Sequence, residues 1–288
     1  RQLVENEQPK YISNEALLYG GIYFEVDSTV KIEGEPEFKN IEYNLFYSKE
    51  SKLRNQIDTS IRGRGFNYLP GTEQEVVAIE KIMKKSKIVV SVKKGYNATE
   101  EYINISSSNI GSPRILHFAT HGFFFPDPKS LYRSSQFFGD HSEPYFKSSD
   151  NPMFRSGLIL AGGNASWHRK DIYNGKDDGI LTAFEISKMN LSNTELVVLS
   201  GCDTGLGEIK NNEGVYGMQR AFKIAGAKYL MMSLWQVPDR ETKEFMVSFY
   251  KNWLSKRKSI PEAFRMTQKE MRERFINPYA WAGFVLVE

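Results

Sequence analysis

Runs of apolar, β-rich residues alternate with helical patterns along the chain. The apolar runs predict strands over residues 17–26, 87–92, 114–120, 157–161, 195–200, 228–237 and 279–287. Apolar positions three and four apart predict helices that open at 69–71, over 181–187 and 214–225, from 238 to about 254, and over 261–275. The run 195–200 has no polar alternation, which is typical of a strand buried on both faces. The pattern therefore predicts an α/β fold with a mainly parallel sheet between helices.

Two segments interrupt this pattern. Residues 28–66 are polar and irregular, and residues 123–155 are rich in aromatics, Ser, Pro and Asp without clear periodicity. Loops of such length in a compact domain are usually functional or mobile. We expect a single domain in which residues 1–68 add an N-terminal strand and an irregular segment to a core at 69–288.

The helix that opens at Leu69 shows two local signals. Thr72 and Glu75 have the spacing of a capping box, in which each side chain satisfies a backbone N–H of the first turn. An apolar stripe follows at Val76, Val77, Ile79, Ile82 and Met83. Both signals predict that one face of this helix packs on the sheet.

Composition narrows the function classes. The chain has 288 residues, 40% of them hydrophobic and 25% charged, and a net charge of only +3, so we expect neither nucleic acid nor an anionic membrane as a partner. No stretch approaches 18 apolar residues, and no signal peptide opens the chain, which starts at Arg1 and is expected to be a piece of a longer protein. A single cysteine excludes an internal disulfide and fits a reducing compartment, so a cytoplasmic location is predicted.

Candidate chemistry lies where two predicted strands end. His121 and Gly122 follow the strand 114–120, and Gly201 and Cys202 follow the strand 195–200. Function in open α/β sheets gathers at the carboxyl ends of the strands. If these two strands are neighbours, about 4.8 Å apart, the imidazole and the thiol can face each other across one cleft.

This pairing suits nucleophilic catalysis. A free thiol has a pKa near 8.5 and is mostly protonated at neutral pH, whereas a nearby imidazolium lowers that pKa. Histidine can also protonate the leaving amine of a cleaved amide. The backbone N–H groups of Gly122 and Cys202 can form an oxyanion hole.

Plainer interpretations exist for several of these residues. A lone cysteine at a strand end can be inert packing, and His117, inside its strand, is expected to be a core histidine with satisfied hydrogen bonds. With one cysteine, and with His117 and His121 four residues apart in a strand, no zinc-ligand set emerges. The glycines of 205–214 lack the Lys-Ser/Thr of a phosphate-binding loop.

Several ordered motifs resemble one known family. The segments "ILHFATHGFF" from Ile115, "LVVLSGCDTGLG" from Leu196, "NEGVYGMQRAFKIAGAKYLMMSLWQVPD" from Asn212 and "WAGFVLV" from Trp281 resemble the CHAT domain, the caspase-like, separase-related cysteine peptidase domain of clan CD. The resemblance covers residues 17–288. It implies a caspase–hemoglobinase-like three-layer sandwich and a catalytic dyad of His121 and Cys202, with residues 69–288 as the peptidase core.

The segment "SLWQVPDRET" from Ser233 resembles the part of separase whose acidic residue binds the basic residue before the scissile bond. By this match Asp239 pairs with an arginine or lysine of the substrate. Asp239 also stands where a helix N-cap belongs, so both roles are open. Ser233 and Trp235, at the end of their strand, are expected to bind substrate backbone in extended form.

The resemblance implies a cysteine endopeptidase that acts on a protein substrate, needs no metal and no cofactor, and is controlled by a partner or by tetratricopeptide-type repeats, none of which occur here. Residues 123–155 and 204–213 are then candidates for loops that order on activation. Two alternatives stay open at this point: a caspase-like scaffold that docks partners without turnover, and a thiol amidase that acts on small molecules.

Overall fold

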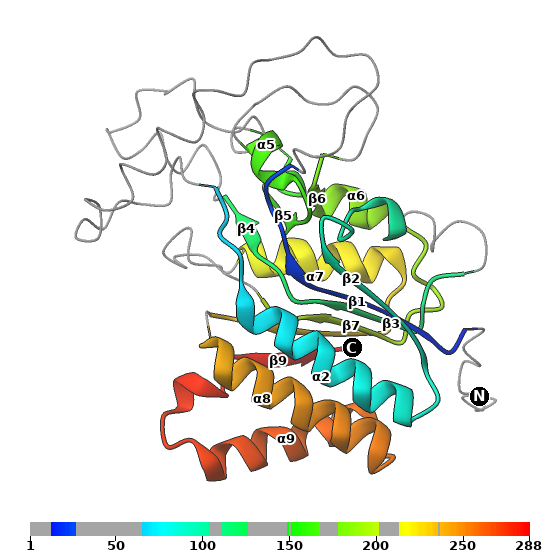
Figure 1. Cartoon of the computed structure of the whole chain (residues 1–288), viewed down its shortest axis with the longest axis vertical. Helices are drawn as coiled ribbons and strands as arrows, with labels where there is room; N and C mark the ends of the chain where they lie inside the picture. Colours follow the sequence, from blue (N-terminus) through cyan, green and yellow to red (C-terminus); the bar gives the residue numbers. More distant parts are fainter. Residues whose placement is uncertain are drawn as a thin grey trace, which may run out of the picture.

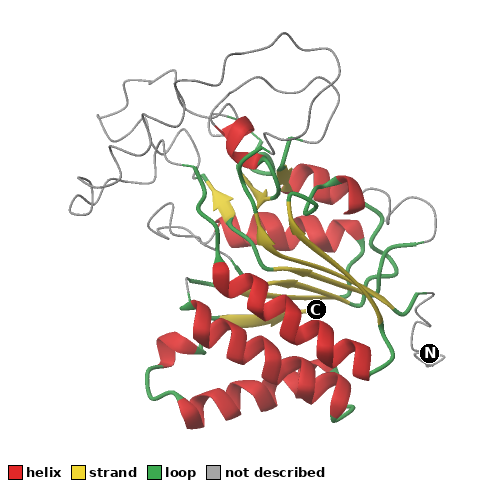
Figure 2. Ribbon diagram, viewed as in Figure 1, coloured by secondary structure: helices red, strands yellow, loops and turns green. Residues whose placement is uncertain are grey.

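The computed structural model describes residues 13–26, 65–103, 111–125, 149, 151–167, 178–201, 213–235 and 237–288. A central sheet lies between two layers of helices (Figures 1 and 2). Across the sheet the strands are β2 (Val89–Gly95), β1 (Glu15–Ile22), β3 (Ile115–Phe118), β7 (Leu196–Leu199), β8 (Tyr229–Ser233) and β9 (Phe284–Val287). All neighbours pair in parallel except β8 and β9. The predicted three-layer α/β sandwich with a mostly parallel central sheet is confirmed.

Each face of the central sheet has its own hydrophobic core. Leu18 points into the core on one face, whereas its neighbours Leu17 and Tyr19 point into the core on the other. The first core is covered by α2 (Pro70–Lys85), α8 (Asp239–Tyr250) and α9 (Ile260–Arg274), and the second by α6 (Ala183–Lys188) and α7 (Glu213–Ala225) (Figure 1). Burial on both faces explains why the strands read as unbroken apolar runs.

Helix α2 begins differently from the sequence prediction. Leu69 is its N-cap residue and makes no side-chain cap hydrogen bond, while Pro70 takes the first helical position, which suits its fixed φ. The Thr72 hydroxyl donates to the Leu69 carbonyl at 2.7 Å, and Glu75 bonds to His117, which lies 42 residues further along the chain. The predicted capping box is therefore wrong, because the long-range partner of Glu75 prevails over the local one.

A second, smaller sheet stands beside the central one. It has the antiparallel order β4 (Gly122–Phe124), β5 (Ser156–Ile159) and β6 (Ile180–Thr182), and a short helix α5 (Gly163–Trp167) follows β5. The sequence indicated only β5, because β4 and β6 are three residues long. Thr182 is the N-cap of α6 and forms a capping box with Glu185, so this helix starts two residues later than predicted.

The C-terminal third follows the predicted order with shorter strands. Helix α7 ends before Gly226, whose φ of 103° suits glycine, and α8 continues into a π-helical turn, η2 (Lys251–Ser255). A 3₁₀ turn, η3 (Pro278–Ala280), precedes β9. Most of the irregular segment 28–66 and of the loop 123–155, and nearly all of 204–213, lie outside the described residues, so the roles expected for them stay predictions.

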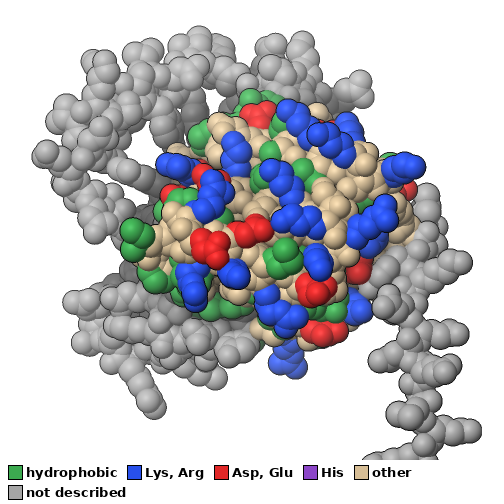
Figure 3. Space-filling view, turned by 90° about the horizontal axis from the view of Figure 1, so that it is seen from below, with side chains coloured by type: hydrophobic (Ala, Val, Ile, Leu, Met, Phe, Trp, Pro, Cys, Tyr) green, Lys and Arg blue, Asp and Glu red, His purple; other side chains and the backbone are tan. Residues whose placement is uncertain are grey.

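The outer surface of the layer that holds α8 and α9 is strongly charged. Figure 3 shows this face from below, with many lysine and arginine side chains and with acidic side chains set between them. Single hydrophobic side chains are scattered among the charges in the same view. A mixed surface of this kind is typical of a helix layer whose outer face meets water.

Candidate active site

Strands β3 and β7 are neighbours, and their register relates the two candidate catalytic positions. Phe118 pairs with Leu199, at the same sequence offset as every other pair in this ladder. The pairing continues past the strand ends, because the Ser200 N–H donates to the Phe118 carbonyl at 2.9 Å. The same offset separates His121 from Cys202 in the sequence. Cys202 itself lies outside the described residues.

Gly201, the residue before Cys202, touches the backbone of β3's extension. A Cβ atom at Gly201 would lie 2.4 Å from the Thr120 carbonyl oxygen and 2.6 Å from its nitrogen. Only glycine allows the two chains to come this close. The Thr120 hydroxyl in turn donates to the Ile159 carbonyl of β5, which joins the end of β3 to the second sheet.

His121 is buried, with 5% of its surface exposed, and its ring is enclosed by aromatic residues. The ring centroid lies 5.0 Å from that of Phe24 and 5.2 Å from that of Phe66. Its Nε2 lies 2.8 Å from the Asn67 carbonyl oxygen. A carbonyl can only accept, so Nε2 carries the hydrogen, and in the neutral ring Nδ1 is the basic nitrogen. This bond fixes both the orientation and the tautomer of the ring.

The segment that carries Asn67 is itself held by a buried side chain. The Phe66 N–H donates to Asn164 Oδ1 at 2.6 Å, and Asn164 Nδ2 donates to the Phe66 carbonyl at 3.0 Å and to Glu25 at 2.9 Å. Asn164 thus binds the backbone as a neighbouring strand would. Its place in α5 connects the second sheet to the orientation of His121, and no local pattern in the sequence indicated this role.

The backbone N–H of Gly122, a predicted oxyanion-hole donor, points away from the neighbouring strand β5. The Ile159 N–H donates to the His121 carbonyl at 2.9 Å, and the Phe125 N–H donates to the Arg155 carbonyl at 2.7 Å. In an antiparallel pair, residues whose backbone groups bond the partner strand alternate with residues whose backbone groups point away from it. His121 is of the bonded kind, so the N–H of the next residue, Gly122, points away from β5. Because β4 is an edge strand among the described residues, this donor is left for another acceptor.

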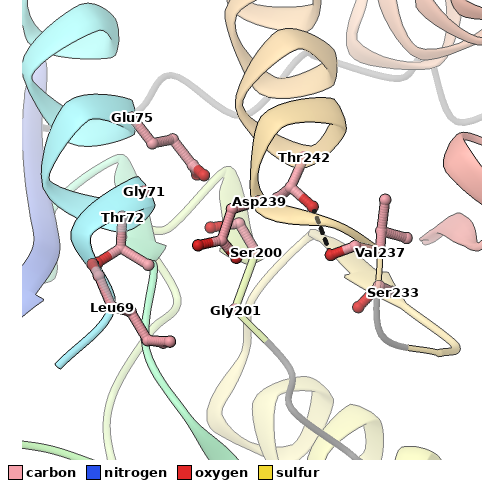
Figure 4. A pocket seen from close by; sticks show the side chains of 10 residues that line it. All are labelled: Leu69, Gly71, Thr72, Glu75, Ser200, Gly201, Ser233, Val237, Asp239 and Thr242. Atoms are coloured by element: carbon pink, nitrogen blue, oxygen red, sulfur yellow. Dashed lines mark hydrogen bonds between the residues drawn. The ribbon is translucent and has the colours of Figure 1, made fainter. Parts of the chain in front are cut away.

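A pocket opens beside Gly201 (Figure 4). It occupies about 440 Å³, including the part that opens to solvent, and the first turns of α2 and α8 line it together with the ends of β7 and β8. Asp239 and Ser233, two of the predicted substrate-binding residues, both line it. The pocket thus lies at the carboxyl ends of β7 and β8 and has an acidic residue in its wall, while a cleft shared by His121 and Cys202 stays a prediction.

Asp239 is not the N-cap of α8. Pro238 occupies the cap position, no side-chain cap bond forms there, and Asp239 is the first helical residue. The Asp239 side chain packs against α2 instead, because a Cβ atom at Gly71 would lie 2.7 Å from its Oδ2. Of the two roles left open for Asp239, the helix N-cap is therefore wrong.

Trp235 is not among the described residues that line the pocket. Its indole N–H donates to the Tyr279 carbonyl at 2.9 Å, and the two rings stack with centroids 5.6 Å apart. The neighbouring Leu234 N–H donates to the Gly283 carbonyl at 2.8 Å, so β9 and the turn before it occupy that side of the strand. Binding of extended substrate by Ser233 and Trp235 stays a prediction.

Glu75 is a pocket residue that the sequence analysis missed. Its side chain is 3% exposed, lines the pocket, and lies with Oε1 2.8 Å from His117 Nε2. The expected core role of His117 is confirmed, since the ring is fully buried and also bonds Tyr250 at 3.2 Å. The spacing of Thr72 and Glu75 suggested a local cap and so concealed the role of Glu75 in the pocket. Glu75 reaches the pocket because α2 packs beside β3, where Glu75 bonds His117.

Two wider features of the structure bear on function. Among the described residues, no group of three or more His, Cys, Asp or Glu side chains could hold a metal ion. None of the helices in the described ranges is long and apolar enough to cross a membrane.

Comparison with known proteins gives partial and distant likenesses. Tetratricopeptide repeat protein 28 of Mus musculus and that of Homo sapiens are 35% and 33% identical to the chain over 111 residues. This stretch is 38% of the chain but 4% of each relative, so the chain covers a small part of their length. The solved structure of the Arg specific cysteine proteinase gingipain R has a TM-score of 0.46 at 8% identity, covering 96% of this chain and 46% of that one.

One family model matches nearly the whole chain. The model described as the CHAT domain covers residues 8–288, which include every strand and helix of the structure. The motifs around His121 and Cys202 lie within this match. The chain therefore belongs to the CHAT domain family.

Proposed function

We propose that this domain is a cysteine endopeptidase with Cys202 as the nucleophile and His121 as its general base and acid. The observation that carries the proposal is the register of β3 on β7, since the offset between paired residues also separates His121 from Cys202. Membership of the CHAT family supports the same role for both residues. A scaffold without turnover would not need an oriented imidazole at this position.

The reaction follows from the groups at the strand ends. His121 Nδ1 takes the proton of the Cys202 thiol, the resulting thiolate attacks the carbonyl carbon of the scissile bond, and the N–H groups of Gly122 and Cys202 stabilise the oxyanion. His121 Nδ1 gives its proton to the leaving amine, and a thioester forms. A water molecule then transfers a proton to His121 and attacks the thioester, which releases the carboxylic acid and returns the thiol. None of these steps requires a metal.

We further propose that cleavage follows a basic residue. Asp239 and Ser233 line the pocket beside Gly201, and neither lysine nor arginine is among its described lining residues. A carboxylate in such a pocket can form charge-assisted hydrogen bonds with a guanidinium or ammonium group. Repeats or a partner are expected to regulate the domain, a proposal that the names of the tetratricopeptide repeat relatives support.

Fluorogenic peptides with arginine, lysine or leucine before the reporter group test this function. We expect cleavage of the basic peptides by the wild type, no cleavage by Cys202→Ala, and a loss of about 10²–10⁴ in kcat for His121→Ala. Asn190→Ala, at an exposed position with local bonds to Ser192, is a control that should keep activity. Absence of cleavage with every peptide, with upstream repeats supplied, would favour the scaffold. Turnover of small amides alone would favour the amidase.

A further inference from the structure

Glu75 is a carboxylate that the proposed chemistry does not use. Because it is buried, its charge must be stabilised by a hydrogen-bond donor or a cation. The side chain is 3% exposed, on a helix whose exposed face carries Glu73 and Glu80 in contact with lysines. Moving a carboxylate out of water is costly unless other groups compensate its charge. The structure supplies one hydrogen-bond donor, His117 Nε2 at Oε1, and the residue lines the pocket.

His117 and Tyr250 hold Glu75 from the core side. Nε2 of His117 donates to Glu75 Oε1 at 2.8 Å, and the Tyr250 hydroxyl donates to His117 Nδ1 at 3.2 Å. Every donor in this series meets an acceptor when His117 is neutral and Glu75 is ionised. Burial raises the pKa of Tyr250 well above its usual value, and the negative charge of Glu75 raises it further, so Tyr250 stays a donor.

Glu75 lines the pocket, while its Oε1 contacts His117 on the core side. Within the described part of the chain, Glu75 has no hydrogen-bond partner other than His117. Figure 4 shows Glu75 extending from α2 into the space that Asp239 enters from α8. Hydroxyl groups of Ser200, Ser233 and Thr242 lie around the same space. Two carboxylates from different helices thus line one pocket, an arrangement that suits a cation.

We propose that Glu75 is a second specificity-determining carboxylate and binds, together with Asp239, the cationic side chain of the substrate residue before the scissile bond. This inference rests on the proposed peptidase function. His117 and Tyr250 act as positioning residues, because they orient the carboxylate and do not reach the pocket lining. The arrangement differs from a single acidic residue at the pocket, because a guanidinium has enough N–H groups to bond both carboxylates.

A binding experiment tests the proposal without requiring turnover. Cys202→Ala protein is titrated with N-acetyl-arginine amide and with N-acetyl-citrulline amide, which has nearly the same shape but no charge, and binding is followed by calorimetry. We expect the arginine compound to bind more tightly, and Glu75→Gln to weaken it about tenfold or more while leaving citrulline binding unchanged. The substituted amide keeps an oxygen that accepts from His117 Nε2, so the fold is preserved.

The control is Glu73→Gln, two residues earlier on the same helix, where the side chain is 43% exposed and bonds Lys94. We expect this variant to bind both compounds as the wild type does. Equal affinity of Glu75→Gln and wild type for the arginine compound would overturn the proposal. Equal binding of arginine and citrulline by the wild type would overturn it as well.

Peptide cleavage separates this proposal from the function on which it rests. In an active enzyme, Glu75→Gln should lower kcat/KM for arginine peptides about tenfold or more and spare citrulline peptides. If no peptide is cleaved while the arginine compound still binds in a manner that depends on Glu75, the peptidase function fails and the cation pocket stands. If peptides are cleaved and Glu75→Gln does not change the preference for arginine, the peptidase function stands and the role of Glu75 in the cation pocket fails.

Discussion

Gly201 lies so close to Thr120 that a Cβ atom on Gly201 would be 2.4 Å from the Thr120 carbonyl oxygen. Each of these residues directly precedes a proposed catalytic residue, Cys202 or His121. Both sides of the contact are backbone, so no change of rotamer can relieve a clash there. The close approach of the two strand ends thus requires glycine, which has no side chain, at position 201.

Gly201→Ala should lower the free energy of unfolding by about 1–3 kcal/mol, because overpacking at this contact must separate β3 from β7. Urea unfolding followed by fluorescence measures the change. Gly122→Ala is the matched control for stability, because its Cβ atom would meet its nearest neighbour at 3.4 Å. Equal losses in the two variants would contradict the packing argument.

Asn164→Ala should both destabilise the fold and impair catalysis. The variant leaves the N–H and carbonyl groups of Phe66 without their buried partners, at a cost of about 1–3 kcal/mol for each group. Because Asn67 orients His121, we expect kcat of the proposed reaction to fall more than KM changes. Asn190→Ala, an exposed asparagine with local bonds to Ser192, is the control and should change neither quantity.

The raised pKa of Tyr250 predicts a specific alkaline behaviour. Above pH 10, the unfolded chain loses the Tyr250 proton while the folded chain keeps it, so stability falls as pH rises. The extra slope is about 1.4 kcal/mol per pH unit for one proton. Tyr250→Phe removes this contribution, so its unfolding free energy should decline less steeply than that of the wild type between pH 10 and 11.

Unfolding curves at several pH values measure these slopes. The control for the loss of a tyrosine hydroxyl is Tyr96→Phe, where the side chain is 41% exposed. Parallel slopes for Tyr250→Phe and the wild type would show that the Tyr250 hydroxyl ionises alike in the folded and unfolded chains.

Gly71→Ala should weaken the proposed preference for basic substrates while the chain still folds. Its Cβ atom would lie 2.7 Å from Asp239 Oδ2 and 2.8 Å from Asp239 Cβ, so the carboxylate must move. The ratio of kcat/KM for arginine and citrulline peptides is expected to fall about tenfold, as for the loss of one charge-assisted pair. An unchanged ratio would place substrate binding elsewhere.

The sequence predicted the strands that are buried on both faces, because their residues are apolar without interruption, as at Leu196–Leu199. It also placed His121 beyond the end of β3, because the apolar run stops there. It did not predict β4 or β6, whose three residues are too few for any periodicity. Both strands exist through pairing with β5, which β4 contacts on one side and β6 on the other.

In the pocket, too, some residues could be predicted from local sequence and others could not. Asp239 lies in a recognisable sequence motif, whereas Glu75 and Asn164 form hydrogen bonds with residues far away in the chain. Glu75 bonds a residue 42 positions later, and Asn164 bonds one 98 positions earlier. Local patterns carry no information about such pairs, so the spacing at Thr72 and Glu75 suggested a cap that does not form.

The pairing of β3 with β7 also determines when the site can form during folding. Its partners lie far apart in the sequence, and closing so long a segment costs more chain entropy than joining neighbouring elements. Helices α8 and α9, whose Phe245 and Phe264 rings lie 5.9 Å apart, can associate earlier. A refolding chain should therefore gain helical signal before it gains the proposed peptidase activity, so that a half-folded protein would not yet cut its surroundings.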